Sequence, residues 1–255
     1  MRKLTLSLLL CGAVGAANAQ EASGVLQLFA CKLAPGKTYE NVWSTLEMTR
    51  QNIDRSAPDY DPGFGIFIWT PFRQATGYDY IWGILNSDLG QMAAGTRNYV
   101  ESGRAALMGP RFADLGHCDA TVTFFDQLTD GMVGSGEDRI ADAAVETFSC
   151  RLRDGSDLDD VIDASEFWQK QIAKIDSPAL NKYRGALLRL FRGGNGEADF
   201  GWVGNYPDWE SFAQGFDDYI GSKEGQAADA RFNAISRCRS ALWNGYWIID
   251  PAELP

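Results

Sequence analysis

The hydrophobic pattern divides the chain into two stretches that carry the same kinds of segment in the same order. The first stretch opens with a nearly continuous apolar segment, as in a buried strand. Apolar residues spaced three and four apart follow, as on one face of a helix. Later segments rich in aromatic and β-branched residues favour strands. In this stretch the pattern predicts strands over 24–33, 64–70, 78–85 and 118–128 and helices over 39–55, 89–100 and 104–115.

The second stretch repeats this order. Gly193-Gly194-Asn195-Gly196 is a strong turn signal that joins two of its strands as a hairpin. Asp88 in the first stretch and Asp208 in the second stand directly before a helical pattern, where an N-cap residue is expected. In the second stretch the pattern predicts strands over 144–153, 185–191, 199–205 and 239–249 and helices over 158–175, 208–219 and 223–237.

Short sequences also recur at matching places. Phe29-Ala30-Cys31-Lys32-Leu33 returns 119 residues later as Phe148-Ser149-Cys150-Arg151-Leu152, and Cys118 returns 120 residues later as Cys238. We therefore interpret the chain as one unit repeated in tandem. The predicted organisation is a leader over 1–19, repeat 1 over 20–130, a linker over 131–143 and repeat 2 over 144–255.

The first 19 residues have the pattern of a secretory signal peptide. A short positive region precedes an apolar run, and Ala17-Asn18-Ala19 is a typical cleavage signal. The formal net charge of −11 becomes −13 without Arg2 and Lys3, which argues against nucleic acid or an anionic membrane surface as the partner. We therefore expect a periplasmic or secreted protein that does not stay at the membrane after cleavage.

Four cysteines remain beyond the leader, an even number that indicates disulfides in an exported chain. The repeat selects Cys31–Cys118 and Cys150–Cys238 from the three possible pairings. Each bond would close a loop of almost ninety residues, for which chain entropy gives a stabilisation of about 4–5 kcal/mol. A metal site is the competing interpretation, but the chain has no C-x-x-C motif and a single histidine, so no metal is predicted.

Each stretch has the order strand, helix, strand, strand, helix, strand, which is the ferredoxin-like unit. In that topology the last strand lies antiparallel beside the first, so the two cysteines of a stretch meet. The predicted fold is α+β. Two tandem ferredoxin-like units would pack their sheets face to face as an intramolecular α/β barrel.

This order, over residues 24–250, resembles the dimeric α/β-barrel superfamily in a fused, duplicated form. The resemblance implies a ligand cleft between the sheet and the two helices of a unit. The superfamily includes cofactor-free monooxygenases and isomerases, cyclases, haem enzymes such as chlorite dismutases, and proteins of no known activity. Fold alone does not choose among these chemistries. We expect no cofactor, and a monomer with an internal pseudo-dimer or a weak homodimer.

Two glutamates are the predicted catalytic residues. Glu47 and Glu166 occupy the same place on the first helix of each stretch, at the border of its apolar face. A partly buried carboxylate there would have a raised pKa and would serve as general acid or base. The alternative is a solvated helix flank or a salt bridge.

The predicted ligand-binding residues are mostly aromatic. Trp82 and Trp202 lie mid-strand in equivalent hairpins and would face either the cleft or the core between the sheets. Arg189 stands inside an apolar strand and calls for an acidic partner or an anionic ligand. The full predicted set is Trp43, Tyr80, Trp82, Trp168, Arg189 and Trp202.

These patterns support two functions. The first is an exported small-molecule-binding protein or cofactor-independent enzyme that acts on a small aromatic or sugar-like compound. The alternative is a non-catalytic periplasmic structural or protein-interaction module. His117, the only histidine, directly precedes Cys118, which argues against a role as haem ligand. One cleft would be functional and the other vestigial, since the two have diverged.

Overall fold

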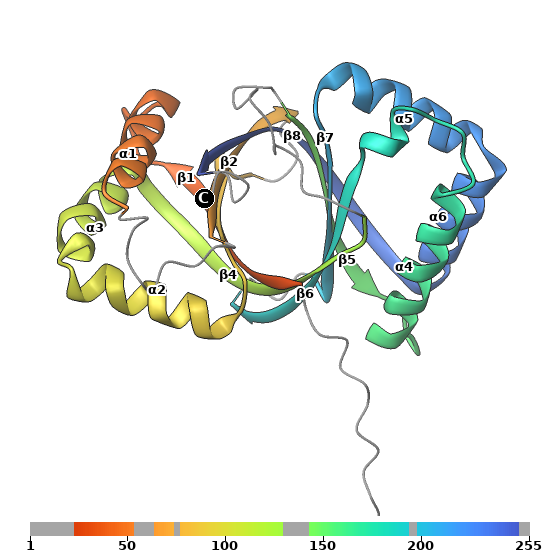
Figure 1. The fold of residues 1–255 in the computed structure, drawn as a ribbon, viewed down its shortest axis with the longest axis horizontal. Helices are drawn as coiled ribbons and strands as arrows, with labels where there is room; N and C mark the ends of the chain where they lie inside the picture. The colour runs from red at the N-terminus through yellow and green to blue at the C-terminus, as the bar shows by residue number, and fades with distance from the viewer. Residues whose placement is uncertain (1–22, 54–63, 74–76, 130–142, 194–197, 250–255) are drawn as a thin grey trace, which may run out of the picture.

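The computed structural model describes residues 23–53, 64–73, 77–129, 143–193 and 198–249. Within them, the strands form a closed antiparallel barrel with three helices against each half of its outer surface (Figure 1). The first half contains β1 (Gly24–Leu33), α1 (Tyr39–Gln51), β2 (Gly65–Arg73), β3 (Tyr80–Asn86), α2 (Leu89–Glu101), α3 (Arg104–Leu115) and β4 (Gly116–Gln127). The second contains β5 (Ala143–Leu152), α4 (Leu158–Ile172), the 3-10 turn η1 (Leu180–Lys182), β6 (Arg184–Gly193), β7 (Phe200–Tyr206), α5 (Trp209–Gly221), α6 (Lys223–Ile235) and β8 (Ser236–Ile249).

The predicted strands and helices are confirmed, with small differences at their ends. The helix α4 stops at Ile172, three residues before the predicted end, and η1 was not predicted. The two N-caps are confirmed, because Asp88 accepts a hydrogen bond from the Gln91 amide and Asp208 accepts one from the Ser211 amide. The predicted leader and most of the linker lie outside the described residues.

The order of strands around the barrel is β1-β3-β2-β8-β5-β7-β6-β4. Within each half the last strand pairs with the first, as predicted. The sheets do not only face each other: β2 pairs with β8 and β4 pairs with β6. A strand at the edge of a sheet exposes unpaired backbone groups. Because the two sheets are joined at both edges, no strand of the barrel is an edge strand. The barrel is therefore one continuous sheet.

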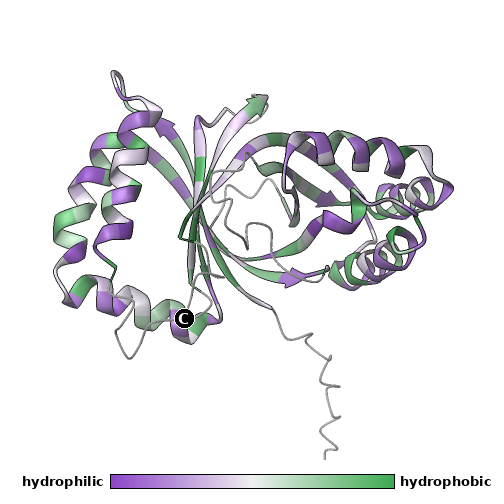
Figure 2. Ribbon diagram, turned by 45° about the horizontal axis from the view of Figure 1, so that its top comes forward, coloured by the Kyte–Doolittle hydropathy of each residue, from purple (hydrophilic) through white to green (hydrophobic). Residues whose placement is uncertain are grey.

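Apolar side chains fill three separate regions. One lies inside the barrel and contains large side chains such as Phe67, Trp69 and Trp243. The other two lie between the barrel and the helices of each half. The flanking helices carry both hydrophilic and hydrophobic residues (Figure 2), because each presents only one face to the sheet. Among the described residues, large side chains therefore occupy the barrel interior, and the helices cover the outer face of the sheet.

Both predicted disulfides are confirmed. Cys31 stands directly opposite Cys118 in the β1–β4 ladder, and Cys150 stands opposite Cys238 in the β5–β8 ladder. Stable disulfides are typical of an oxidising compartment. Within the part of the chain that the structure describes, no helix is long and apolar enough to cross a membrane.

Removing either disulfide is expected to lower the free energy of unfolding by about 4–5 kcal/mol, because the bonded residues are 87 and 88 positions apart and chain entropy depends on loop length. The double variants Cys31→Ser/Cys118→Ser and Cys150→Ser/Cys238→Ser therefore serve as controls for each other in urea unfolding. Losses that differ severalfold between the two would contradict this entropic explanation.

Candidate functional site

Each half contains one cavity between the outer face of the barrel and its helices. The first cavity has a volume of about 520 Å³ and lies under α1, α2 and α3. The second has a volume of about 450 Å³ and lies under α4, α5 and α6. Both volumes suit a small organic molecule. The cavities share a backbone frame but differ in the polar side chains that line them.

The second cavity has an aromatic wall into which several ionisable groups project. Trp168 and Trp202 meet edge to face, with ring centroids 4.9 Å apart. Tyr183 packs against Trp168 and accepts a hydrogen bond of 2.8 Å from Nε1 of Trp202. The polar and ionisable residues of this lining include Glu146, Tyr183, Tyr206, Tyr219, Asp229, Asn233 and Ser240.

Glu146 is the main ionisable group of this cavity. It lies on β5, on the same face as Phe148 and Cys150, and therefore points toward the helices. Burial, together with the smaller effect of the nearby charge of Asp229, raises the pKa of Glu146 to about 7. Among the described residues, no group donates a hydrogen bond to its carboxylate. A carboxylate with this pKa and no donor is suited to take a proton from a bound molecule.

Three tyrosines surround this carboxylate. The Tyr219 hydroxyl donates a hydrogen bond of 2.8 Å to Asp229. Burial raises the pKa of Tyr183, Tyr206 and Tyr219 well above the usual value, and the charge of Glu146 raises each of them further. Their hydroxyls thus stay protonated. The proton of Tyr219 is donated to Asp229, whereas Tyr183 and Tyr206 can donate hydrogen bonds to an oxygen of a ligand.

The first cavity lacks most of these groups. Only Tyr219 has the same residue at its equivalent position, Tyr99, which lines the first cavity. Equivalent elements lie 119 or 120 positions apart, so each residue of one cavity can be matched with one of the other. At the other four equivalent positions the first half has neither a carboxylate nor a tyrosine. Gln27, Phe64, Asn86 and Gly109 correspond in that order to Glu146, Tyr183, Tyr206 and Asp229.

Three predicted ligand-binding residues line the cavities. Trp82 forms part of the wall of the first cavity, stacked on Phe29 at a centroid distance of 4.2 Å. Trp168 and Trp202 line the second. Of the two placements considered for Trp82 and Trp202, the structure shows the one under the helices.

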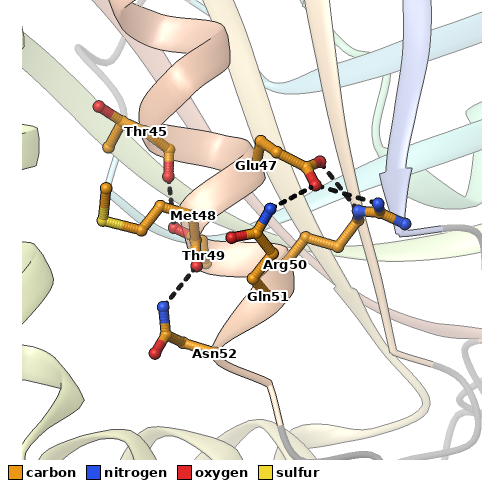
Figure 3. A network of polar contacts seen from close by, with 7 residues as sticks. All are labelled: Thr45, Glu47, Met48, Thr49, Arg50, Gln51 and Asn52. Atoms are coloured by element: carbon orange, nitrogen blue, oxygen red, sulfur yellow. Dashed lines mark hydrogen bonds and ion pairs between the residues drawn. The ribbon is translucent and has the colours of Figure 1, made fainter.

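The two glutamates predicted to be catalytic lie outside both cavities. Glu47 is about half exposed and makes two hydrogen bonds, of 2.9 and 3.0 Å, with the guanidinium of Arg50 (Figure 3). These bonds lower the pKa of Glu47. Glu166 is also exposed and lies 3.5 Å from Lys170 on the next turn. Both match the alternative interpretation, a helix flank with a salt bridge, because their position at the border of the apolar face turns them toward solvent.

The other predicted binding residues have structural partners. Trp43 packs edge to face on Tyr246 in the first helix-sheet core. Tyr80 is buried in the same core, and burial raises its pKa to about 12. Arg189 has the acidic partner that the sequence predicted, because its Nη2 donates a hydrogen bond of 2.8 Å to Oδ1 of Asp126. None of the three lines either cavity.

The sequence interpretation overlooked Glu146 and its neighbours because it compared positions that the two stretches share. The informative positions are those that differ. Glu146 is an acid inside an otherwise apolar strand whose counterpart carries Gln27, and this contrast could have identified it.

The residues present do not supply a histidine ligand for haem in either cavity. The side chain of His117 is 87% exposed, lies 3.6 Å from Asp119 and lines neither cavity. Within the described residues, no cluster of three His, Cys, Asp or Glu side chains could hold a metal ion. We therefore derive no step through such a group.

Comparisons with known proteins give a fold and no closer relationship. No protein-family model and no curated protein matches the sequence. Among solved structures, a candidate monooxygenase from Fusobacterium nucleatum subsp. nucleatum aligns over 89% of this chain and 94% of its own, with a TM-score of 0.57 and 13% identity. An anthrone oxidase-like protein aligns over 91% and 96%, with a TM-score of 0.53 and 14% identity.

A third similar structure, a candidate chlorite dismutase, aligns over 91% of this chain and 97% of its own, with a TM-score of 0.52 and 13% identity. Identities of this size establish a common fold and nothing about activity. The three structures support the dimeric α/β-barrel fold that the order of elements predicted.

The raised pKa of Glu146 predicts a specific dependence of stability on pH. The folded state binds the proton more tightly than the unfolded state, so the stabilisation is present below pH 4.5 and is lost as the pH rises through about 7. Relative to wild type, Glu146→Gln should gain about 1.4 kcal/mol of unfolding free energy per pH unit between about pH 5 and about pH 7. Urea unfolding at several pH values measures this.

Glu47→Gln is the matched control. The pKa of Glu47 is lowered, so Glu47 stays ionised in both states over this range and the variant should track wild type. A constant difference between wild type and Glu146→Gln would contradict the assignment of a raised pKa.

Proposed function

We propose that the protein is a cofactor-independent enzyme that abstracts a proton from a small planar aromatic compound bound in the second cavity. The observation that carries this proposal is the carboxylate of Glu146, with a pKa of about 7 and no hydrogen-bond donor, in an aromatic cavity. Among the described lining residues, carboxylates occur in the second cavity and not in the first, although the two cavities occupy equivalent places in the fold. Structural needs common to both halves would not produce this asymmetry, which favours an enzyme over the non-catalytic periplasmic structural or protein-interaction module.

The residues of the cavity have distinct roles in this proposal. Glu146 is the general base, and a pKa near neutral pH suits it to both taking and returning a proton. Trp168 and Trp202 provide apolar surface for an aromatic ring. As a proton leaves the substrate, negative charge develops on its oxygen. The hydroxyls of Tyr183 and Tyr206, which remain protonated, would donate hydrogen bonds to that oxygen.

The architecture around the site is part of the proposal. The matched spacing of elements and disulfides supports two tandem ferredoxin-like repeats over 20–130 and 144–255. Export through a leader over 1–19 to the periplasm accords with the two disulfides. A barrel that closes within one chain needs no second copy, and we propose a monomer.

Anthrone is a suitable probe because it is a planar tricyclic ketone with an acidic methylene group, and one similar structure is described as anthrone oxidase-like. Wild-type protein is expected to accelerate exchange of the methylene hydrogens with D₂O under argon, with a rate that rises with pH through about 7. Glu146→Gln should lower the enzymatic rate by about 10²- to 10⁴-fold. Proton NMR of anthrone measures the exchange.

Glu47→Gln and Glu166→Gln are controls of the same chemistry on exposed carboxylates and should exchange at the wild-type rate. Wild-type protein that exchanges anthrone no faster than buffer would count against this substrate class. Equal rates for wild type and Glu146→Gln would remove Glu146 as the base.

A further inference from the structure

Asn86, at the end of β3, has a buried polar atom without a partner. Its side chain is 3% exposed and lines the first cavity. Among the described residues, the amide nitrogen Nδ2 is the single buried side-chain polar atom with no hydrogen-bond partner. Buried donors in folded proteins are almost always paired, because an unpaired one has lost its water without gaining a replacement. A donor left unpaired beside a cavity indicates that a bound molecule supplies the acceptor.

The second half shows how much space is open next to Asn86. There the equivalent residue is Tyr206, whose ring packs so closely on α5 that a Cβ added at Gly215 would lie 2.6 Å from it. The equivalent pair in the first half is Asn86 and Gly95. A Cβ added at Gly95 would meet nothing within 4 Å. The first cavity therefore contains an open space where the second half holds an aromatic ring.

The wall of the first cavity is flat and apolar. Phe29, Trp82 and Phe112 stack in sequence, with centroid distances of 4.2 and 5.1 Å and interplanar angles of 11° and 10°. In the second half, by contrast, Trp202 and Phe232 meet edge to face at 81°. Among the described residues that line the first cavity, Arg104 is the only charged one, so no carboxylate there can act as a base.

We propose that the first cavity is a separate binding site for a planar, largely apolar carbonyl compound. A ring of the ligand occupies the space that Tyr206 fills in the second half, and the carbonyl oxygen accepts a hydrogen bond from Nδ2 of Asn86. The described part of its lining has no carboxylate, and the cavity binds this compound without transforming it. The site is independent of the reaction proposed for the second cavity.

Three rigid tricyclic compounds of similar shape test this proposal by equilibrium dialysis against the full, oxidised chain. 9-Fluorenone has a carbonyl acceptor, fluorene has none, and carbazole carries an N–H donor instead. Fluorenone is expected to bind about tenfold more tightly than the other two, because it alone pairs the buried amide. The same affinity for all three compounds would overturn the proposal.

Two variants locate the site. Asn86→Leu keeps the approximate size of the side chain and removes the donor, so fluorenone should bind it no more tightly than fluorene. The variant should also have a higher midpoint of thermal unfolding without ligand, since the unpaired amide is gone. Gly95→Phe places a ring in the open space from α2 and should abolish binding of fluorenone at the first cavity. A helix-interior glycine also tolerates replacement well.

The matched control is Glu146→Gln in the second cavity, which should leave the preference for fluorenone over fluorene intact. If Gly95→Phe binds fluorenone like wild type, the compound binds elsewhere and the proposal fails. A wild-type preference for fluorenone that survives in Asn86→Leu would also overturn it, because Asn86 would not be the donor. Loss of anthrone exchange in Glu146→Gln does not bear on any of these outcomes.

Discussion

The pairing of the first and last strand of each half is the constraint on which the rest of the structure depends. The β1–β4 and β5–β8 ladders bring together residues almost ninety positions apart, and a disulfide joins each pair in register. With these strands side by side, the first half has β2 and β4 at its sheet edges, and the second half has β8 and β6. The edges of the two halves then pair with each other, so that the sheet closes and leaves no open edge between the halves.

Closure of the barrel determines where a small molecule can bind. Its interior is filled by side chains such as Phe67, Trp69 and Trp243, and the helices lie outside. The two cavities described above lie between helices and sheet, one in each half. The two halves can therefore diverge independently, because a substitution under α5 and α6 does not affect packing under α2 and α3. The carboxylate of Glu146 in one cavity and the unpaired amide of Asn86 in the other are consistent with separate roles.

The three glutamates discussed above differ in how far their carboxylates are buried. Glu47 and Glu166 lie on helix surfaces beside a cation and resemble many surface salt bridges. Glu146 projects from the sheet into an aromatic cavity, where the charged form is poorly solvated and its pKa rises. Helical periodicity places a residue at the border of an apolar face without showing which side of the border it faces. Strand alternation is stricter, and it places Glu146 under the helices together with Cys150.

The sequence by itself determined the order of strands and helices and the pairing of the cysteines. Those features follow from local periodicity and from spacings that recur along the chain. Only the tertiary structure decided that the two sheets share edges, that Glu146 and Asp229 line the same cavity, and that Tyr206 fills a space left open beside Asn86. Glu146 and Asp229 come from a strand and a helix more than eighty positions apart. Their proximity depends on how β5 lies beneath α6, which no local pattern of the sequence shows.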